Sequence, residues 1–319
     1  GIDIDLELAS MALLVLIVGI NIMGVKRIKK IQTPIVMFST LYLLSLCVYA
    51  VATQELDWSV ATSEDSFGNW SDIASTSAFV FVSYAGVTKI AAVGGEIKDP
   101  ARNMPYGILL SLLFGCILYV SVTMVMTVTV APTDYMGGDH GAREDPIYIF
   151  AEAVGGEVVG VVAAILAVVT MTSMALAGIL ASSRFPFAMA RDKLLPQFLE
   201  NVHGKYGTPH WAIIGTGISM ALAITFLPVH DVAELASGFQ IMIFMLINAC
   251  VIILRSSSES HAWYHPDWKT PWPLFPLVQL FGIFGGGVLL YYMGTKSLVG
   301  AIAAIVLGTI LFRSYGINR

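Results

Sequence analysis

The chain has 319 residues, a formal net charge of −5 and a mean hydropathy of +0.77; 56% of its residues are hydrophobic and only 12% are charged. This apolar share lies far above that of ordinary soluble domains, so water is not the only solvent of the chain, and no nucleic-acid partner is expected. Several unbroken apolar runs reach the roughly 20 residues that a helix needs to cross a bilayer, unlike the alternating segments of membrane barrels. The sequence therefore predicts an all-α integral membrane protein, with the lipid bilayer as a partner.

Nine apolar runs are expected to form transmembrane helices within one domain, residues 1–319. In chain order they lie at roughly 7–24, 31–53, 75–95, 105–131, 157–190, 210–228, 232–254, 274–293 and 296–313. Between the fourth and fifth runs, residues 132–156 predict an outer loop with a surface helix. Pro186 predicts a bend near the end of the fifth run, because proline lacks the N–H of the helical hydrogen bond. The cysteines fall inside apolar runs and are expected to be small core residues: Cys47, Cys116 and Cys250.

The distribution of charged residues predicts the orientation of the chain. If the loop after the first run is cytoplasmic, almost all Lys and Arg residues outside the membrane lie on that side, and only Arg143 and Lys296 face the other. Short cytoplasmic loops collect Lys and Arg, so this one-sided pattern predicts a start outside and a cytoplasmic C-terminus. We expect a multi-pass protein of the cell membrane.

The third run is poorly suited to a continuous helix. Gly86 and the pair Gly94 and Gly95 lower its helix propensity, and Lys89 places a group that can carry charge among apolar neighbours. A break is therefore predicted near residues 83–86, where freed backbone groups would face protein, water or a ligand near the bilayer midplane. The alternative is that the small residues only allow close packing of helices.

The loop after the third run carries a specific motif. Residues 96–105 read Glu-Ile-Lys-Asp-Pro-Ala-Arg-Asn-Met-Pro, and this resembles the loop after the sixth helix of the amino acid/polyamine/organocation (APC) permease family. Other stretches resemble further helix ends of that family: Asn21–Lys26, Ala190–Pro196, Gly207–Pro209 and Pro271–Pro276. On this register the chain covers helices four to twelve. Because it starts at Gly1 rather than Met, we expect an internal start, with helices one to three missing from it.

The resemblance implies a fold and a site. The fold would be the inverted five-helix-repeat transporter fold (LeuT-like), N-terminally incomplete, with broken first and sixth helices round a central site. Carbonyls near Val82 and Ala85 would accept hydrogen bonds from a substrate ammonium, and Tyr84 could cover the site, where the alternative is a tyrosine that only packs. The substrate-binding residues implied are Val82, Ser83, Tyr84, Ala85, Gly86 and, from the eighth helix, Gly178.

Two sets of residues are candidates for ion coupling. Lys89 would lie close to the middle of the bilayer and could couple protons to transport; the alternative is a lysine that only stabilises the helix break. By the resemblance, Thr172 and Ser173 could hold a sodium ion, although hydroxyls in membrane helices often bond back to their own backbone.

The loop motif itself predicts a structural clamp. Asp99 is expected to cap the turn at Pro100, Arg102 to bridge helix ends beside Asn103, and Pro105 to occupy the first turn of the next helix.

The function implied is a secondary active transporter that moves amino acids or related amines by alternating access, with proton coupling or exchange. Two alternatives stay open: a cation/chloride cotransporter-like carrier, and a non-transporting nutrient sensor on the same fold. A membrane enzyme has the least support, because the sequence contains neither a His-Glu-x-x-His nor a Gly-x-Ser-x-Gly motif. We expect no catalytic residues, no cofactor and no metal site; the partners expected are the substrate and protons or sodium.

Overall fold

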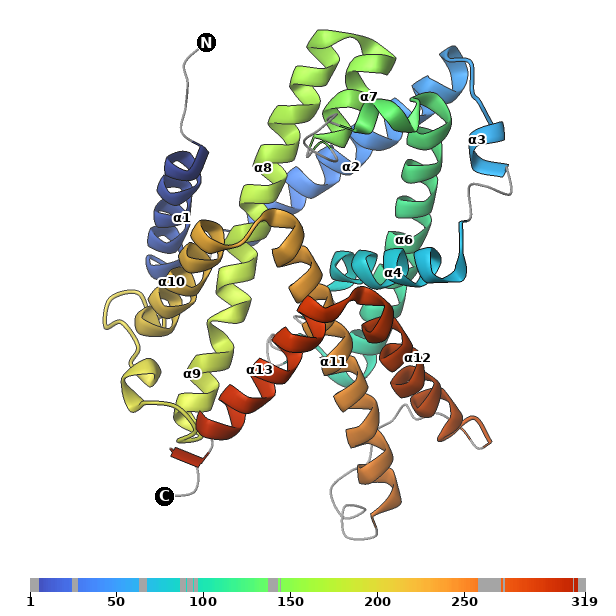
Figure 1. The fold of residues 1–319 in the computed structure, drawn as a ribbon. Coiled ribbons are helices and arrows are strands. Elements are labelled where there is room, and N and C mark those ends of the chain that lie inside the picture. The colour runs from blue at the N-terminus through green and yellow to red at the C-terminus, as the bar shows by residue number, and fades with distance from the viewer. Residues whose placement is uncertain are drawn as a thin grey trace.

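The computed structural model describes residues 6–24, 28–62, 68–86, 90, 94, 97–136, 143, 145–257, 271, 273–311 and 313–314. Its long regular elements are all helices (Figure 1). The α-helices are α1 (Leu6–Ile22), α2 (Ile28–Thr53), α3 (Ser59–Thr62), α4 (Trp70–Val80), α6 (Pro100–Thr129), α7 (Pro146–Gly155), α8 (Glu157–Ser182), α9 (Arg184–Arg191), α10 (His210–Phe226), α11 (Val229–Ser256), α12 (Leu277–Met293) and α13 (Thr295–Leu311). Short 3-10 helices are η2 (Phe81–Tyr84), η4 (Pro132–Tyr135) and η6 (Gln197–Glu200).

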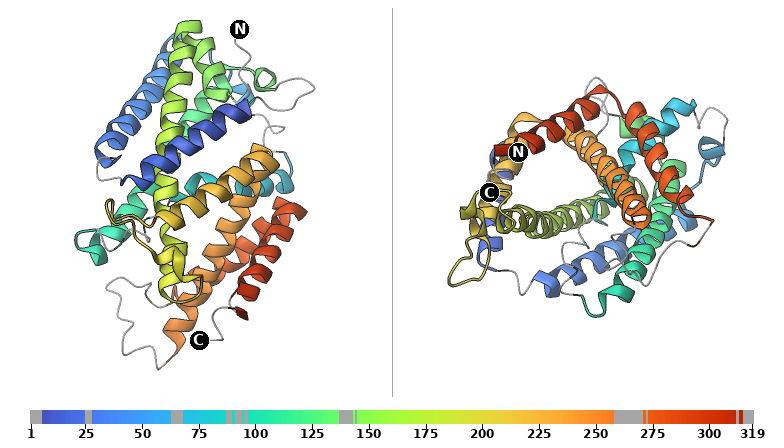
Figure 2. Two further views of the ribbon diagram at one scale, coloured as in Figure 1. Left: turned by 90° about the vertical axis from the view of Figure 1, so that its left-hand side faces the viewer. Right: turned by 90° about the horizontal axis from the view of Figure 1, so that it is seen from below.

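Three buried clusters hold these helices together. The first joins α2, α6, α7 and α8 around the fully buried Phe150. The second joins α1, α8 and α10 around Ile179 and Ile213, and the third joins α4, α11 and α12 around Ala78 and Ile241. The helices surround a gap between ribbons when seen from below, with α8 on one side and α11 and α13 on others (Figure 2, right). α8 therefore links the first two clusters, while the third forms around the broken helix.

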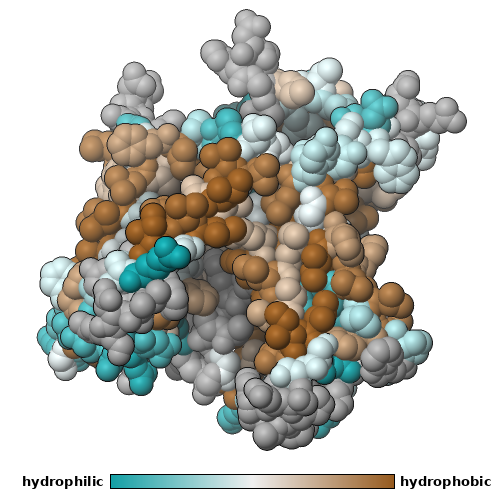
Figure 3. Space-filling view, turned by 60° about the horizontal axis from the view of Figure 1, so that its bottom comes forward, coloured by the Kyte–Doolittle hydropathy of each residue, from teal (hydrophilic) through white to brown (hydrophobic). Residues whose placement is uncertain are grey.

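The outer surface of the helices is strongly apolar. Four helical stretches are long and apolar enough to cross a membrane: Gln32–Thr53, Pro100–Thr129, Glu157–Arg191 and Val229–Ser256. Shorter apolar helices include α1, α10, α12 and α13. Hydrophobic residues spread across much of the face in Figure 3, and large side chains such as Phe281 of α12 are exposed. Such a surface suits lipid as its solvent, while the number of spanning helices and the inverted repeat stay predictions.

Several elements differ from the predicted runs. The third run holds an α-helix of only 11 residues followed by a 3-10 turn, so the predicted interruption is present. α6 begins at Pro100, which places Pro105 inside the helix; its assignment to the first turn was wrong. The long fifth run changes from α8 to α9 at Ser183, three residues before Pro186, while a bend there stays a prediction. α7 forms within the predicted outer loop and buries one face.

The cysteines differ in their burial. Cys47 is buried in the first cluster, whereas Cys116 and Cys250 are exposed on the apolar outer surface. The expectation that all three are core residues was therefore wrong for two of them. A cysteine is small and apolar enough to face either protein or lipid, and an apolar run alone does not tell which.

Candidate functional site

The broken helix begins with a local cap. The backbone N–H of Asn69 donates to the carboxylate of Asp72 at 3.1 Å, which satisfies a group at the helix start. α4 then continues for three turns and ends at Val80. From there the hydrogen bonds tighten to the i to i−3 pattern: Phe81 donates to Ala78, and Ala85 donates to the carbonyl of Val82 at 3.0 Å. The change from α to 3-10 geometry thus falls beside the segment expected to bind substrate.

A serine from a distant helix bridges this change. Ser237 of α11 is fully buried, and its hydroxyl accepts a hydrogen bond from the N–H of Val82 at 3.0 Å. The same hydroxyl donates to the carbonyl of Phe79 at 2.8 Å. Backbone groups that lose their helical partners inside a membrane fold need replacements. Ser237 supplies one donor and one acceptor on the two sides of the junction.

Aromatic rings on α11 hold the same segment. The ring of His230 meets Phe79 edge to face at 5.0 Å, and Phe244 meets Phe81 at 5.6 Å. These residues and Ser237 lie 7 and 7 positions apart on α11, so they share one face of the helix. That face of α11 contacts the chain on both sides of the end of α4. α11 therefore positions the backbone at the break.

The other side of the 3-10 turn contacts α6. The ring of Tyr84 packs edge to face on Tyr119 at 5.5 Å, and the Tyr119 hydroxyl donates to the carbonyl of Ser83 at 3.3 Å. Both rings lie between η2 and α6, which favours the packing alternative for Tyr84 over a cover of the site. The 3-10 turn is consequently held between α11 and α6.

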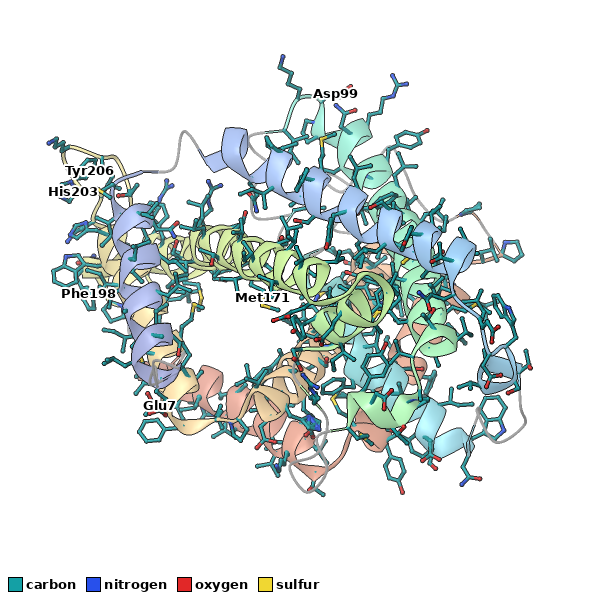
Figure 4. All side chains as sticks on the ribbon, turned by 90° about the horizontal axis from the view of Figure 1, so that it is seen from above. Glu7, Asp99, Met171, Phe198, His203 and Tyr206 are labelled. Carbon is teal, nitrogen blue, oxygen red and sulfur yellow. The ribbon has the colours of Figure 1, made fainter. Side chains whose placement is uncertain are left out.

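The remaining predicted binding residues lie on α8. Gly178 is on this helix, which packs against α1 and α10 in the second cluster. Thr172 donates to the carbonyl of Val168 at 2.8 Å, as expected for a hydroxyl that bonds back to its own helix, and Ser173 is buried. Met171, their neighbour, lies at the edge of the opening between helices in Figure 4. The structure brings Val82 to Gly86 together at the break and leaves the α8 residues on a separate helix.

The predicted coupling residue, Lys89, lies outside the described residues. Among the described residues, no group of three His, Cys, Asp or Glu side chains could hold a metal ion. An open cavity of about 320 Å³ lies against α4 on the side of α11. Its lining residues come from these two helices and the end of α12: Ser75, Thr76, Phe79, His230, Glu234 and Met293.

The loop motif builds the start of α6. Asp99 adopts a left-handed backbone conformation, with φ of 49°, just before Pro100 in the first helical position. The predicted cap by the Asp99 side chain is absent, and its carbonyl instead accepts the N–H of Asn103 at 2.9 Å. The Asn103 amide donates to the carbonyl of Lys98, and Arg102 is exposed. Asp99 lies at the periphery in Figure 4, in keeping with a structural role.

Sequence reasoning missed two residues of this site, Ser237 and Tyr119. Ser237 precedes Gly238 near the start of an apolar run, and a hydroxyl there is a weak signal of an interhelical hydrogen bond. Tyr119 gave no signal, because a tyrosine in an apolar helix is common. Only the packing of α6 and α11 on the 3-10 turn reveals them.

Helices able to span a bilayer define a multi-pass membrane protein. A helix break whose backbone groups are satisfied by another helix, as they are here by Ser237, is a feature of many transporter folds. The chain belongs to the amino acid permease family, whose profile matches residues 6–312. This confirms the resemblance found from the loop motif, and the family consists of permeases rather than enzymes.

Relatives of the chain include three transport proteins. The branched-chain amino acid permease BcaP of Bacillus subtilis is 30% identical over 300 residues, which are 92% of this chain and 60% of the relative. The methylthioribose transporter of Bacillus subtilis is 28% identical over 97% of this chain and 64% of its own. The vacuolar cationic amino acid transporter 4 of Arabidopsis thaliana is 30% identical over 76% and 40%. The chain thus spans less than two thirds of the length of these relatives.

Proposed function

We propose that the complete protein is a secondary active transporter that moves amino acids or related amines across the cell membrane by alternating access. The observation that carries this proposal is the break after Val80 in a chain of the amino acid permease family. A break of this kind offers main-chain groups to a polar ligand inside an apolar fold. Relatives named as branched-chain and cationic amino acid transporters support the substrate class.

The segment Val82 to Gly86 would bind the substrate ammonium through main-chain carbonyls. The carbonyl of Val82 accepts one hydrogen bond, from Ala85, and a carbonyl oxygen has two lone pairs. A second acceptor direction is therefore compatible with an ammonium donor. Gly178 would complete the site from α8. The fold proposed around this site is the inverted five-helix repeat. In it, this chain would contribute nine spanning helices and end on the cytoplasmic side.

Coupling to protons is proposed to use Lys89. A lysine near the middle of the bilayer is costly unless it faces the protein interior, and such residues commonly mark ion pathways. A sodium site at Thr172 and Ser173 has less support, because the Thr172 hydroxyl already donates to its own helix.

Uptake by the complete protein in proteoliposomes tests this function. Labelled leucine and arginine should accumulate when an inward proton gradient is imposed, and unlabelled methylthioribose should compete poorly. Lys89→Met should keep the fold and lose the dependence of uptake on pH, whereas Lys98→Met, in the loop, should retain it.

The alternatives give different outcomes in the same assay. Binding of leucine without any counterflow would indicate a sensor, and rubidium or chloride flux without amino acid flux would indicate a cation/chloride carrier. Uptake that requires sodium and is indifferent to pH in both the parent and Lys89→Met proteins would reject the proton-coupling role of Lys89.

A further inference from the structure

The hydroxyl of Ser237 differs from most other hydroxyls of the apolar helices; Ser39 and Ser297 also reach another helix. Side chains such as Thr172 of α8 and Thr216 and Thr225 of α10 donate to the carbonyl four residues earlier in their own helix. That local bond is the usual choice for a hydroxyl in a membrane helix. Ser237 instead reaches across to α4, where it bonds to two backbone groups of another element.

The two bonds of Ser237 lie on opposite sides of the helix end. Phe79, whose carbonyl accepts at 2.8 Å, belongs to α4, and Val82, whose N–H donates at 3.0 Å, belongs to η2. A regular α-helix would use these groups within its own ladder. Because Ser237 is fully buried, removing its hydroxyl takes one hydrogen bond from each of these backbone groups inside the protein, where such a loss is costly. The bridge therefore favours a helix that stops here.

Close packing fixes α11, which carries Ser237. A Cβ added to Gly238 would lie 3.0 Å from the Cβ of Ser297, so α11 and α13 approach as closely as a glycine permits. On the adjoining side, a Cβ at Gly286 of α12 would lie 2.6 Å from Met245. Glycines let helix backbones approach closely and increase the van der Waals contact between them. Ser237 is thus presented to the broken helix from a firmly packed support.

We infer that Ser237 is a positioning residue for substrate binding: its hydroxyl fixes where α4 ends and so orients the segment Val82 to Gly86. The effect of Ser237 on substrate binding rests on the proposed function. The effect of Ser237 on the backbone does not depend on that function. Ser237 lies on the far side of this backbone from Tyr84, which contacts α6. It acts by holding main-chain groups in place rather than by touching substrate.

Three variants of the complete protein in detergent test the inference. Ser237→Ala removes both hydrogen bonds, and Ser237→Cys fills similar space with a weaker donor and acceptor. Ser183→Ala is the matched control, because Ser183 is also buried but donates only to Leu180 in its own segment, at 3.2 Å. Leucine affinity and hydrogen exchange of a peptide covering residues 79–86 are measured for each.

The expected order of leucine affinity is Ser, then Cys, then Ala, with a loss of about tenfold for Ser237→Ala, the size expected for two buried hydrogen bonds. Exchange in residues 79–86 should be about tenfold faster in that variant, and both quantities should be unchanged in Ser183→Ala. If Ser237→Ala gives no folded protein, the test uses Ser237→Cys. A leucine affinity below that of the parent and faster hydrogen exchange in residues 79–86 would then support the inference.

The inference would be overturned if both Ser237 variants kept the leucine affinity and the hydrogen exchange of the parent. It would also be overturned if Ser183→Ala lost as much leucine affinity as Ser237→Ala. A parent protein that binds no amino acid would reject the proposed function alone. In that case the exchange data still decide, since faster exchange in Ser237→Ala supports the bridge and unchanged exchange overturns it.

Discussion

Two long apolar runs of this chain are interrupted, and the two interruptions are built differently. At the change from α8 to α9, Ser183 keeps a helical backbone, with φ of −65° and ψ of −18°. Its N–H bonds to Ile179 at 3.0 Å and its hydroxyl donates to Leu180. Pro186, three residues on, removes one helical donor. All of these groups lie within a few residues of the change from α8 to α9.

The break after Val80 depends on distant parts of the chain. Ser237, which bridges it, lies 155 residues after Val82, and the Tyr119 hydroxyl bonds to a carbonyl 36 residues earlier. Such a break persists only while α6 and α11 stay in place. The comparison indicates that a change built from neighbouring residues is a fixed feature of its segment, whereas a break held by other helices can respond when those helices move.

The largest effect should come from disturbing the support of α11. A Cβ at Gly286 would lie 2.6 Å from the Cγ of Met245 and 3.3 Å from Ile241, whereas one at Gly285 would meet nothing within 4 Å. Gly286→Ala should therefore lower the free energy of unfolding by about 1–3 kcal/mol through overpacking. Gly285→Ala should leave it unchanged or raise it by up to about 1 kcal/mol through helix propensity.

Thermal unfolding of the complete protein in detergent measures both glycine variants. Leucine affinity should fall in Gly286→Ala as well, because α11 carries the residues that hold the break. Equal stability of the two variants would show that α12 does not fix α11.

The sequence predicted what depends on local chemistry and on motif. The apolar runs indicated helices, Pro186 lies close to the change from α8 to α9, and the glycines near residue 86 indicated an interruption. The end of α4 at Val80 was not predictable, because it depends on the approach of Ser237 from α11. Pro105 was misplaced for a related reason: Pro100 and the backbone of Asp99 already start α6, and a second proline is tolerated inside it.

A smaller effect is expected at the contact with α6. Tyr119→Phe removes the hydrogen bond to Ser83, which is long at 3.3 Å, and keeps the ring that packs on Tyr84. Leucine affinity should fall by roughly twofold, about 0.5 kcal/mol, the low end for one hydrogen bond. Tyr42→Phe is the matched control, because its hydroxyl donates to Val159 at 2.8 Å within the first cluster, away from the break.

Equilibrium binding and thermal unfolding separate the two tyrosines. Tyr42→Phe should lower stability without changing affinity, and Tyr119→Phe should do the reverse. A loss of affinity in Tyr42→Phe as large as that in Tyr119→Phe would mean that the 3-10 turn has no special connection to α6.

The smallest effect is expected at the change from α8 to α9. Pro186→Ala restores an N–H that can bond back to Ser182, while the bonds of Ser183 to Ile179 and Leu180 do not involve residue 186. Stability should change by less than about 1 kcal/mol, because proline near the start of a helical segment costs little. Leucine affinity should stay within about twofold of the parent. Circular dichroism should show equal or slightly greater helicity. A tenfold loss of affinity in this variant would show that the change from α8 to α9, like the break, helps to position the substrate, and the distinction between the two interruptions would then fail.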